Sequence, residues 1–246
     1  MDTLAGLVER LSNALPATTE IVLHDLRKLP SSIVAVAGNV TNRSVGDPPT
    51  DVLLEYMASG SHDDLLRYPT DLPDGRRLQS STLIFRTGAG KPLAALCVNN
   101  EVTHWIALRR VAELALGAEA GTPAPDAPAD LVVALAGAVA EDAGVPAPSA
   151  AHGEWFAHSV DELAGHMIEK AIDEIGVPVG LMRKEHKLRV VAELEARGMF
   201  LIRDAIETVA ASLEVSRFTI YNYLNELAAG SKTATNSRAR SKASNE

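Results

Sequence analysis

The sequence predicts an α+β fold, in which an N-terminal antiparallel sheet with flanking helices precedes an all-α C-terminal domain. Two β-rich runs flank the short Gly-containing loop TGAGK at residues 87–91, which is typical of a β-hairpin. Residues 117–130 are rich in Pro, Ala and Gly and poor in large apolar groups, as in a linker. Residues 203–227 show two apolar stripes at helical spacing, separated by a short interruption. We therefore expect two domains of different construction.

The N-terminal part alternates helix and strand patterns. Its first helix is expected over residues 1–15, where Leu4, Leu7, Leu11 and Leu15 recur at helical spacing before Pro16. Further helices are expected at 49–60 and 103–118, and strands at 20–26, 31–40 and on both sides of the hairpin loop. This order of elements predicts a first domain over residues 1–116.

The remaining chain is expected to be helical apart from its linkers. We place a Pro/Ala-rich linker region at 117–153, a helical domain at 154–228, and a disordered basic tail at 229–246. A helix is expected at 159–176, where Ser159 and Glu162 have the spacing of a capping box.

Composition restricts the class of protein. Hydrophobic residues make up 46% of the chain, which predicts a globular protein. Cys97 is the only cysteine, so no disulfide framework is expected within the chain. The N-terminal stretch resembles no signal peptide, and the longest apolar run is too short to span a bilayer. We expect a cytoplasmic protein without membrane attachment.

The net charge of -9 conceals a marked asymmetry along the chain. Residues 1–180 hold 12 Lys and Arg against 24 Asp and Glu, whereas residues 181–246 hold 11 against 8. Because acidic surfaces repel nucleic acids, any binding of a polyanion is expected in the last quarter of the chain.

The segment 203–227 predicts a helix-turn-helix. Its two apolar stripes can bury against each other only if the chain turns sharply at residues 214–216. Ala210 is small enough for a close helix crossing, and Ser216 can cap the second helix through its hydroxyl. Glu214 occupies a turn position where Gly is usual, and a left-handed conformation there costs about 1 kcal/mol. Gly198 is expected to end the preceding helix.

The second helix of this motif carries an unusual outer face. Arg side chains pair with guanine edges or phosphates, Asn reads adenine, and Tyr hydroxyls contact phosphates or base edges. We therefore expect a surface that contacts DNA, formed by Ser216, Arg217, Phe218, Thr219, Tyr221, Asn222 and Tyr223. The alternative is a helical hairpin in an interaction or dimerisation protein that binds no DNA.

Four separated segments resemble the YheO-like PAS family with its C-terminal DauR-like helix-turn-helix. They are VLHDL, SIVAVAGNVTNRSVGDPPTD, SSTLIFRTGAGKPLAALCVNNEVT and MFLIRDAIETVAASLEVSRFTIYNYL, in the family's order. The resemblance covers residues 1–110 and 155–227. It implies a bacterial transcriptional regulator, in which a PAS-like sensor or dimerisation domain is joined to a domain that binds operator DNA.

Polar side chains interrupt the expected strands. One face of an antiparallel sheet can line a small cavity, where such groups would hold a small-molecule effector. The candidate ligand residues are His24, Asn39, Arg43, Ser80, Ser81, Thr82 and Asn99. Alternatively, these groups satisfy one another and the backbone, because buried polar groups need partners in either case.

Nothing in the sequence indicates an enzyme, a cofactor or a metal site. Ser81, His24 and Asp25 are the residue types of a nucleophilic triad, but adjacent His and Asp on a strand point to opposite faces. No pair of His or Cys residues has the spacing of a metal site. Because a single recognition helix covers one DNA half-site, we expect a homodimer or a higher homo-oligomer. The helices at 1–15 and 159–175 carry apolar stripes that could pair subunits or pack within one.

Overall fold

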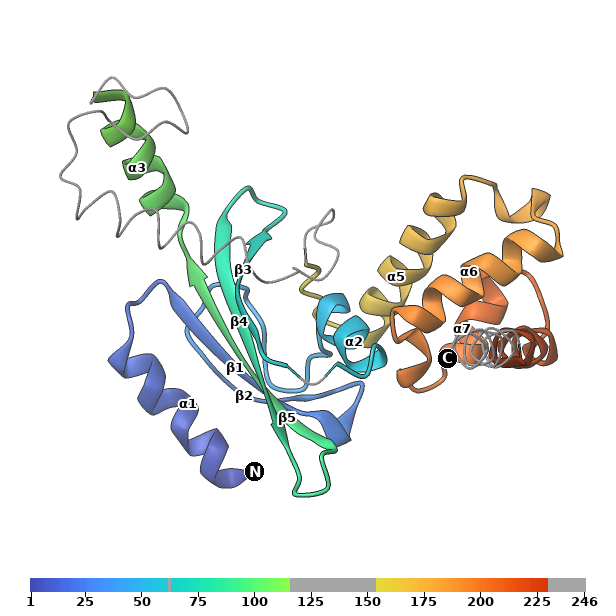
Figure 1. Cartoon of the computed structure of the whole chain (residues 1–246), viewed down its shortest axis with the longest axis horizontal. Helices are drawn as coiled ribbons and strands as arrows, with labels where there is room; N and C mark the ends of the chain where they lie inside the picture. Colours follow the sequence, from blue (N-terminus) through green and yellow to red (C-terminus); the bar gives the residue numbers. More distant parts are fainter. Residues whose placement is uncertain (62, 116–153, 230–246) are drawn as a thin grey trace, which may run out of the picture. The chain divides into compact units, whose positions relative to one another are not determined.

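The computed structural model describes residues 1–61, 63–115 and 154–229, and these form two compact units (Figure 1). The sheet unit combines Met1–Pro49 with His62–Phe156, and the helical unit combines Thr50–Ser61 with Ala157–Glu246. The expected linker at 117–153 and residues 230–246 of the expected tail lie outside the described residues.

A five-stranded antiparallel sheet forms the sheet unit. Its strand order is β2-β1-β5-β4-β3, so β1, β5 and β4 are interior strands. The strands are β1 (Thr19–Asp25), β2 (Ile33–Ala37), β3 (Leu65–Asp71), β4 (Arg77–Arg86) and β5 (Pro92–Glu101). Helix α1 (Asp2–Ala14) precedes the sheet, and α3 (Thr103–Ala115) follows β5. The antiparallel sheet and its helices confirm the α+β prediction for this part of the chain.

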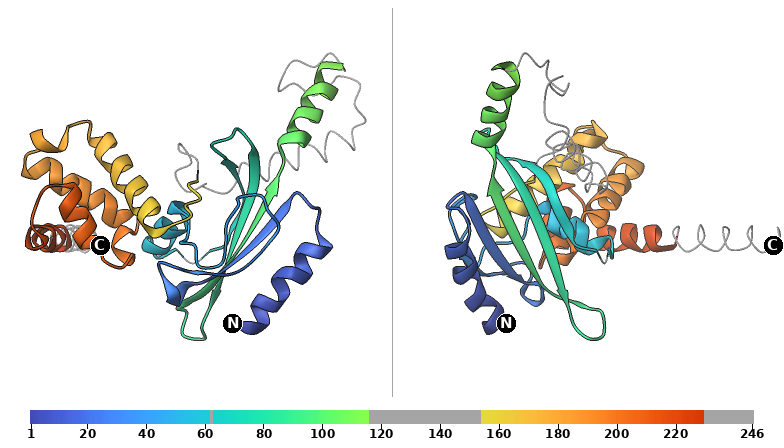
Figure 2. Two further views of the ribbon diagram at one scale, coloured as in Figure 1. Left: turned by 180° about the vertical axis from the view of Figure 1, so that it is seen from behind. Right: turned by 60° about the vertical axis from the view of Figure 1, so that its left-hand side comes forward.

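The two faces of the sheet differ in chemistry because successive side chains along a strand point to opposite sides. Ile21 and Leu23 of β1 pack with Val8 of α1 in an apolar core. Figure 2 shows α1 running along this face. Glu20 and His24 alternate with these apolar residues and point to the opposite face, yet both are buried. A second apolar cluster of Val40, Leu72, Leu78 and Phe156 lies at that opposite face.

Strand β3 is absent from the elements expected from sequence. Its alternation is broken by a register shift between Leu65 and Tyr68, where Arg67 takes a positive φ of 56°. Pro69 lies within the strand and lacks the N–H that an interior strand requires. The edge position of β3 accommodates this proline, since an edge strand has one side without a partner strand.

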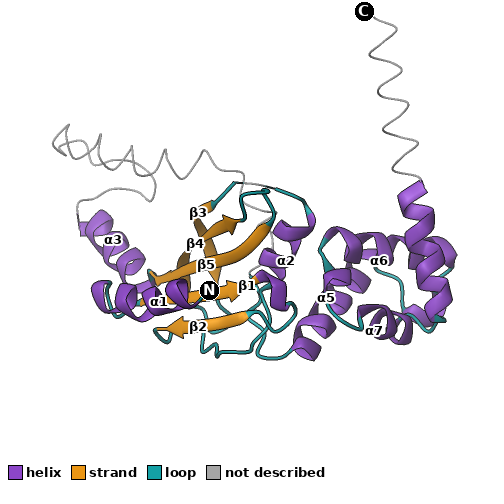
Figure 3. Ribbon diagram, turned by 90° about the horizontal axis from the view of Figure 1, so that it is seen from below, coloured by secondary structure: helices purple, strands orange, loops and turns teal. Residues whose placement is uncertain are grey.

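The helical unit contains the C-terminal helices and one helix from the N-terminal part of the chain (Figure 3). Its α-helices are α2 (Asp51–Ala58), α5 (Val160–Ile175), α6 (Lys184–Ala196), α7 (Ala205–Ser212) and a last helix over residues 217–229. Short 3-10 turns lie at Val179–Leu181 and Met199–Leu201. Its core side chains are buried, among them Leu163, Met167, Leu194, Met199, Leu213 and Ile220.

Helix ends follow the chemistry expected from the sequence. Ser159 caps α5, because its Oγ accepts a hydrogen bond from the Glu162 N–H at 3.1 Å. The Glu162 carboxylate accepts from the His158 N–H rather than from Ser159, so the expected capping box is shifted by one residue on that side. Gly198 has a φ of 78° after the last residues of α6, as expected for a glycine that ends a helix.

Helix α2 packs among the C-terminal helices, although its sequence lies between β2 and β3. Thr50 caps it through a 3.2 Å hydrogen bond from the Leu53 N–H. Leu54 is fully buried, and its carbonyl oxygen lies against Gly198 so closely that a Cβ there would be 2.6 Å away. Sequence reasoning groups this helix with the N-terminal domain, since only tertiary contacts reveal its partners.

Candidate functional site

The helix-turn-helix is formed by α7 and the helix at 217–229. Ala210 and Leu213 are buried between them, and the Val215 N–H donates to the Ala210 carbonyl at 3.0 Å. Glu214 adopts the left-handed backbone conformation with a φ of 52°, which is unfavourable for a residue other than glycine. Ser216 caps the second helix by accepting a 3.2 Å hydrogen bond from the Thr219 N–H. The turn therefore forms as expected.

The second helix divides the expected DNA-contacting residues into two groups. Phe218 and Tyr221 are 81% and 52% exposed, and Arg217 and Asn222 are also exposed. Tyr223 is only 6% exposed and points inward, as Ile220 does. Thr219 is half-buried, and Ser216 is exposed at the cap. The structure therefore brings six of the seven residues to one outer surface and its rim, and places Tyr223 in the core.

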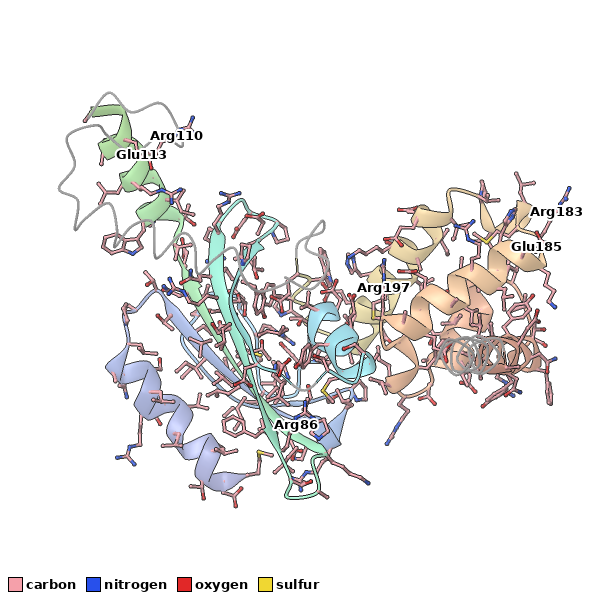
Figure 4. The ribbon with its side chains drawn as sticks, viewed as in Figure 1. Arg86, Arg110, Glu113, Arg183, Glu185 and Arg197 are labelled. Carbon is pink, nitrogen blue, oxygen red and sulfur yellow. The ribbon has the colours of Figure 1, made fainter. Side chains whose placement is uncertain are left out.

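The cations near this surface have partners within the fold, and two of these partners are acidic. Arg217 Nη1 lies 2.9 Å from Glu207 Oε1, and Lys184 Nζ lies 2.8 Å from Glu226 Oε2. Lys187 Nζ donates to the Leu213 carbonyl at 2.6 Å. Figure 4 shows Arg183 and Glu185 extending from the first residues of α6, with Arg197 near its other end.

A polar face covers the side of the sheet opposite α1. Residues paired across antiparallel strands share a face. Glu20 pairs with Asn99, which pairs with Ser80, which pairs with Tyr68. In the next row Val22, Cys97 and Thr82 are paired in the same way. The structure thus gathers side chains from four strands into one buried polar surface, which we call the polar face.

Hydrogen bonds join the polar face into a chain. Asn99 Nδ2 donates to Glu20 Oε1 at 3.4 Å, and the Ser80 hydroxyl donates to Asn99 Oδ1 at 3.0 Å. The Thr70 hydroxyl lies 3.2 Å from both Ser80 Oγ and Glu154 Oε2 and can donate to either. A second link joins the Tyr68 and Thr82 hydroxyls at 3.0 Å. These contacts stabilise the buried polar groups by satisfying them within the fold.

Five of the seven candidate ligand residues are buried in this region: His24, Arg43, Ser80, Thr82 and Asn99. Asn39 is exposed in the segment after β2. Ser81 pairs with Val98, as Ile21 does, and therefore lies on the α1 side of the sheet. Its Oγ accepts a hydrogen bond from the Arg67 N–H at 2.9 Å. Asn39 and Ser81 are thus not brought together with the other five.

Comparison with known proteins matches both units. Residues 1–116 match the YheO-like PAS domain, and residues 163–225 match an HTH domain. The chain therefore carries a YheO-like PAS domain joined to an HTH domain. These matches confirm the resemblance, and the combination of the two domains, together with a relative named as a transcriptional regulator, indicates a DNA-binding transcriptional regulator rather than an enzyme.

Curated relatives extend over most of the chain. Transcriptional regulator DauR of Pseudomonas aeruginosa is 29% identical over 213 residues, which cover 86% of each chain. Uncharacterized protein YheO of Escherichia coli strain K12 is 25% identical, covering 92% of this chain and 83% of its own. An uncharacterized protein of Haemophilus influenzae is also 25% identical, covering 92% and 90%. No solved structure gave a significant match.

Burial sets the protonation states on the polar face of the PAS domain. Burial, with a smaller effect of the Arg43 charge, lowers the pKa of His24 to about 3, so the imidazole is neutral at pH 7. Burial also raises the pKa of the Cys97 thiol to about 12. The His24 Nδ1 atom lies 2.8 Å from Ser32 Oγ. Arg43 is therefore the cation of a region in which His24 and Cys97 are uncharged.

Several residues of the polar face escape sequence reasoning. These are Glu20, Tyr68, Thr70, Cys97 and Glu154. Glu20 offers a signal, since it stands beside an apolar run where a strand is buried on both faces. Its carboxylate accepts hydrogen bonds from the Val40 and Thr41 N–H groups and from the Thr41 hydroxyl. Glu154 offers none, because it follows the linker and reaches the sheet only in the folded chain.

Ser81, His24 and Asp25 do not form a Ser-His-Asp triad in the structure. His24 points to the polar face, while Ser81 and Asp25 point to the α1 side. Asp25 is held instead by Arg27, which donates to it at 2.9 and 2.8 Å. In the described ranges no helix is long and apolar enough to cross a bilayer, and no cluster of acidic, His or Cys side chains is arranged to hold a metal ion.

Proposed function

We propose that the chain is a dimeric transcriptional regulator that reads operator DNA through the helix at 217–229 and senses a small molecule through its PAS domain. The exposed side of that helix supports the DNA-reading role most directly. Arg217, Phe218, Tyr221 and Asn222 are exposed on a helix whose opposite side is buried. Side chains of these types on an exposed helix surface are suited to contact with base edges and phosphates.

The turn geometry supports insertion of this helix into the major groove. Its N-terminal end carries the exposed Arg217 directly after the Ser216 cap. In helix-turn-helix proteins, residues near the start of the second helix contact the base edges. The helix N-terminus also attracts a phosphate through its exposed N–H groups. Tyr223 would then act by packing the helix into the domain rather than by touching DNA.

A sensor role is supported by the polar face of the PAS domain. His24, Arg43, Ser80, Thr82 and Asn99 are buried in one region. Burial of so many polar groups is costly unless they serve as partners for one another or for a ligand. Most find partners within the fold, whereas the Nε and Nη2 atoms of Arg43 have none in the part of the chain that the structure describes.

Dimerisation is supported by apolar side chains that remain exposed in the sheet unit. Leu7 and Leu11 of α1 and Leu15, which follows it, are each about two-fifths exposed. On α3 the exposed residues are Trp105, Leu108 and Val111. The stripe of α5 is buried within the helical unit, so of the two helices that sequence reasoning offers for pairing, α1 is the better suited. A two-fold dimer would bind an inverted repeat.

The DNA-reading role is tested by selecting bound sequences from a random duplex library and titrating the selected site. Arg217→Ala should weaken binding about tenfold or more at matched salt. Arg77→Ala in β4 removes the same charge from an exposed position of the sheet unit and should bind as the wild type does. Equal binding by the Arg217→Ala variant would exclude this surface as the reading surface.

The dimer is tested by sedimentation of the full chain at micromolar concentration. The expected mass is that of at least two chains, and the selected operator should contain two half-sites about one helical turn apart. A monomer that binds one asymmetric site tightly would contradict the dimer without affecting the DNA-reading role.

A further inference from the structure

Arg43 is a buried cation with unused hydrogen-bond donors. Its residue is 7% exposed, and its Nε and Nη2 atoms are buried without a hydrogen-bond partner among the described residues. A buried guanidinium without partners is strongly unfavourable, because it has lost its water without replacement. Its position in the PAS domain therefore requires an explanation.

The two nitrogens without partners, Nε and Nη2, lie on the edge of the guanidinium that can donate two parallel hydrogen bonds. In a guanidinium, Nε–H and one Nη2–H point in parallel along one edge and match the two oxygens of a carboxylate. The same domain shows this pairing at Arg27, whose Nε and Nη2 donate to the two oxygens of Asp25 at 2.9 and 2.8 Å. Arg43 presents the same edge with no carboxylate on it.

Nearby carboxylates do not fill this role. Glu20 is occupied by the Thr41 hydroxyl, by the Val40 and Thr41 N–H groups and by Asn99. Glu154 accepts from Thr70, and neither glutamate bonds to Arg43. Glu154, Asp47 and Glu20 nevertheless offset the Arg43 charge electrostatically. A ligand with one negative charge is favoured over a dianion, because these carboxylates repel each further negative charge while Arg43 supplies a single positive one.

We propose that Arg43 binds the carboxylate of a small monocarboxylate effector through its Nε and Nη2 atoms. The inference rests on the proposed sensor role and names the chemical class of its ligand. The neutral His24 imidazole and the Tyr68 and Thr82 hydroxyls lie on the polar face and provide uncharged donors and acceptors for the rest of such a molecule.

The first test needs no knowledge of the effector. Protein freed of small molecules by unfolding and refolding is compared with Arg43→Met and with Arg77→Gln, whose arginine is exposed. Arg43→Met should raise the unfolding midpoint of the sheet unit, because it replaces an uncompensated charge with an apolar chain of similar length. Arg77→Gln should leave the midpoint unchanged. A lower midpoint for Arg43→Met would show that another part of the chain already pairs Arg43 and would overturn the proposal.

The second test uses small monocarboxylates, including amino acids, each paired with its neutral amide at matched ionic strength. At least one carboxylate should bind the wild type, measured by calorimetry, and its amide should bind at least about tenfold more weakly. Arg43→Lys should also weaken binding, since it keeps the charge and loses the parallel donors. Binding by inorganic phosphate alone, equal binding by amides, no binding by any carboxylate, or unchanged affinity in Arg43→Met would each overturn the proposal.

Measurements of operator affinity distinguish the carboxylate site at Arg43 from the sensor role of the PAS domain. If a carboxylate binds through Arg43 and operator affinity stays the same, the site exists and the sensor role fails. If a neutral molecule changes operator affinity equally in the wild type and Arg43→Met, the sensor role holds and the carboxylate inference fails.

Discussion

Arg217 and Glu207 form an ion pair across the helix-turn-helix, with Nη1 and Oε1 2.9 Å apart. Arg217 begins the second helix and Glu207 lies in the first turn of α7. The hydrogen bond from Arg217 lowers the pKa of Glu207, so this carboxylate stays ionised at pH 7. Both side chains are at least half exposed, so the pair contributes little to stability. On the proposed DNA-contacting surface, we expect its main effect to be on DNA binding.

Removing the Glu207 charge should strengthen DNA binding. In Glu207→Gln, Arg217 no longer has to leave an anionic partner, and the phosphates approach a less negative surface. We expect affinity for the selected operator to rise roughly two- to tenfold at low salt, with a smaller gain at high salt. Asp71→Asn in β3, which breaks another exposed ion pair, is the control. Weaker binding by Glu207→Gln would instead mean that Glu207 positions Arg217 for its contact.

Two tyrosines on the same helix should respond to substitution in opposite ways. Tyr221 is 52% exposed and Tyr223 is 6% exposed. Tyr221→Ala should weaken operator binding about tenfold and change stability by less than about 0.5 kcal/mol. Tyr223→Ala should destabilise the helical unit by about 3 kcal/mol, because it leaves a cavity in the core. Mobility shifts and denaturation followed by circular dichroism check both variants, and a stable Tyr223→Ala variant with impaired binding would return Tyr223 to the reading surface.

Two glycines with similar backbones should differ in their tolerance of alanine. Gly176 and Gly198 have φ values of 68° and 78°, so alanine is strained at both, at about 1 kcal/mol. At Gly176 the new Cβ meets nothing closer than 4.0 Å, whereas at Gly198 it meets the Leu54 carbonyl oxygen at 2.6 Å. Gly198→Ala should therefore cost a further 2 kcal/mol or so in urea denaturation. Equal costs would show that α2 moves away without penalty.

Acid should destabilise the sheet unit through His24. Its pKa falls from 6.5 to about 3 in the folded chain, so the unfolded chain takes up a proton first as the pH drops. The stabilising contribution is complete above pH 6.5 and is lost progressively towards pH 3. Between pH 7 and pH 5 the loss should be about 2 kcal/mol.

Both tryptophans, Trp105 and Trp155, lie in the sheet unit, so their fluorescence reports on its unfolding. In urea titrations at several pH values, His24→Gln should show a flatter dependence on pH than the wild type. The exposed His104 provides the control, since His104→Gln should retain the wild-type slope. A wild-type slope in His24→Gln would mean that other groups cause the acid sensitivity.

Local chemistry explains why the helix-turn-helix is predictable from sequence. The stripe of Ile220, the small Ala210 and the Ser216 cap all act within about twenty residues, and each is found as expected. Tyr223 differs from the expected surface position, although the same local pattern accounts for it. It lies three residues after Ile220 and follows the buried stripe, so helical spacing alone gives enough information to place it in the core.

Features that depend on distant segments are not predictable in the same way. Strand β3 contains Pro69 and a register shift, and only its edge position beside β4 makes it a strand. Glu154 reaches Thr70 across 84 residues of sequence. The unused donors of Arg43 become visible only once its surroundings are known, because a sequence shows which donors exist and not which are satisfied.

The passage of α2 into the helical unit has a consequence for how such proteins can be recombined. The chain passes from one unit to the other near residues 49, 61 and 156, so a single crossover cannot exchange one complete unit for another. A hybrid joined at residue 156 would inherit α2 from one parent and Gly198, which lies against the Leu54 carbonyl, from the other. The PAS and HTH domains of homologous chains are therefore expected to diverge together, with residues around 54 and 198 changing in concert rather than being exchanged as independent modules.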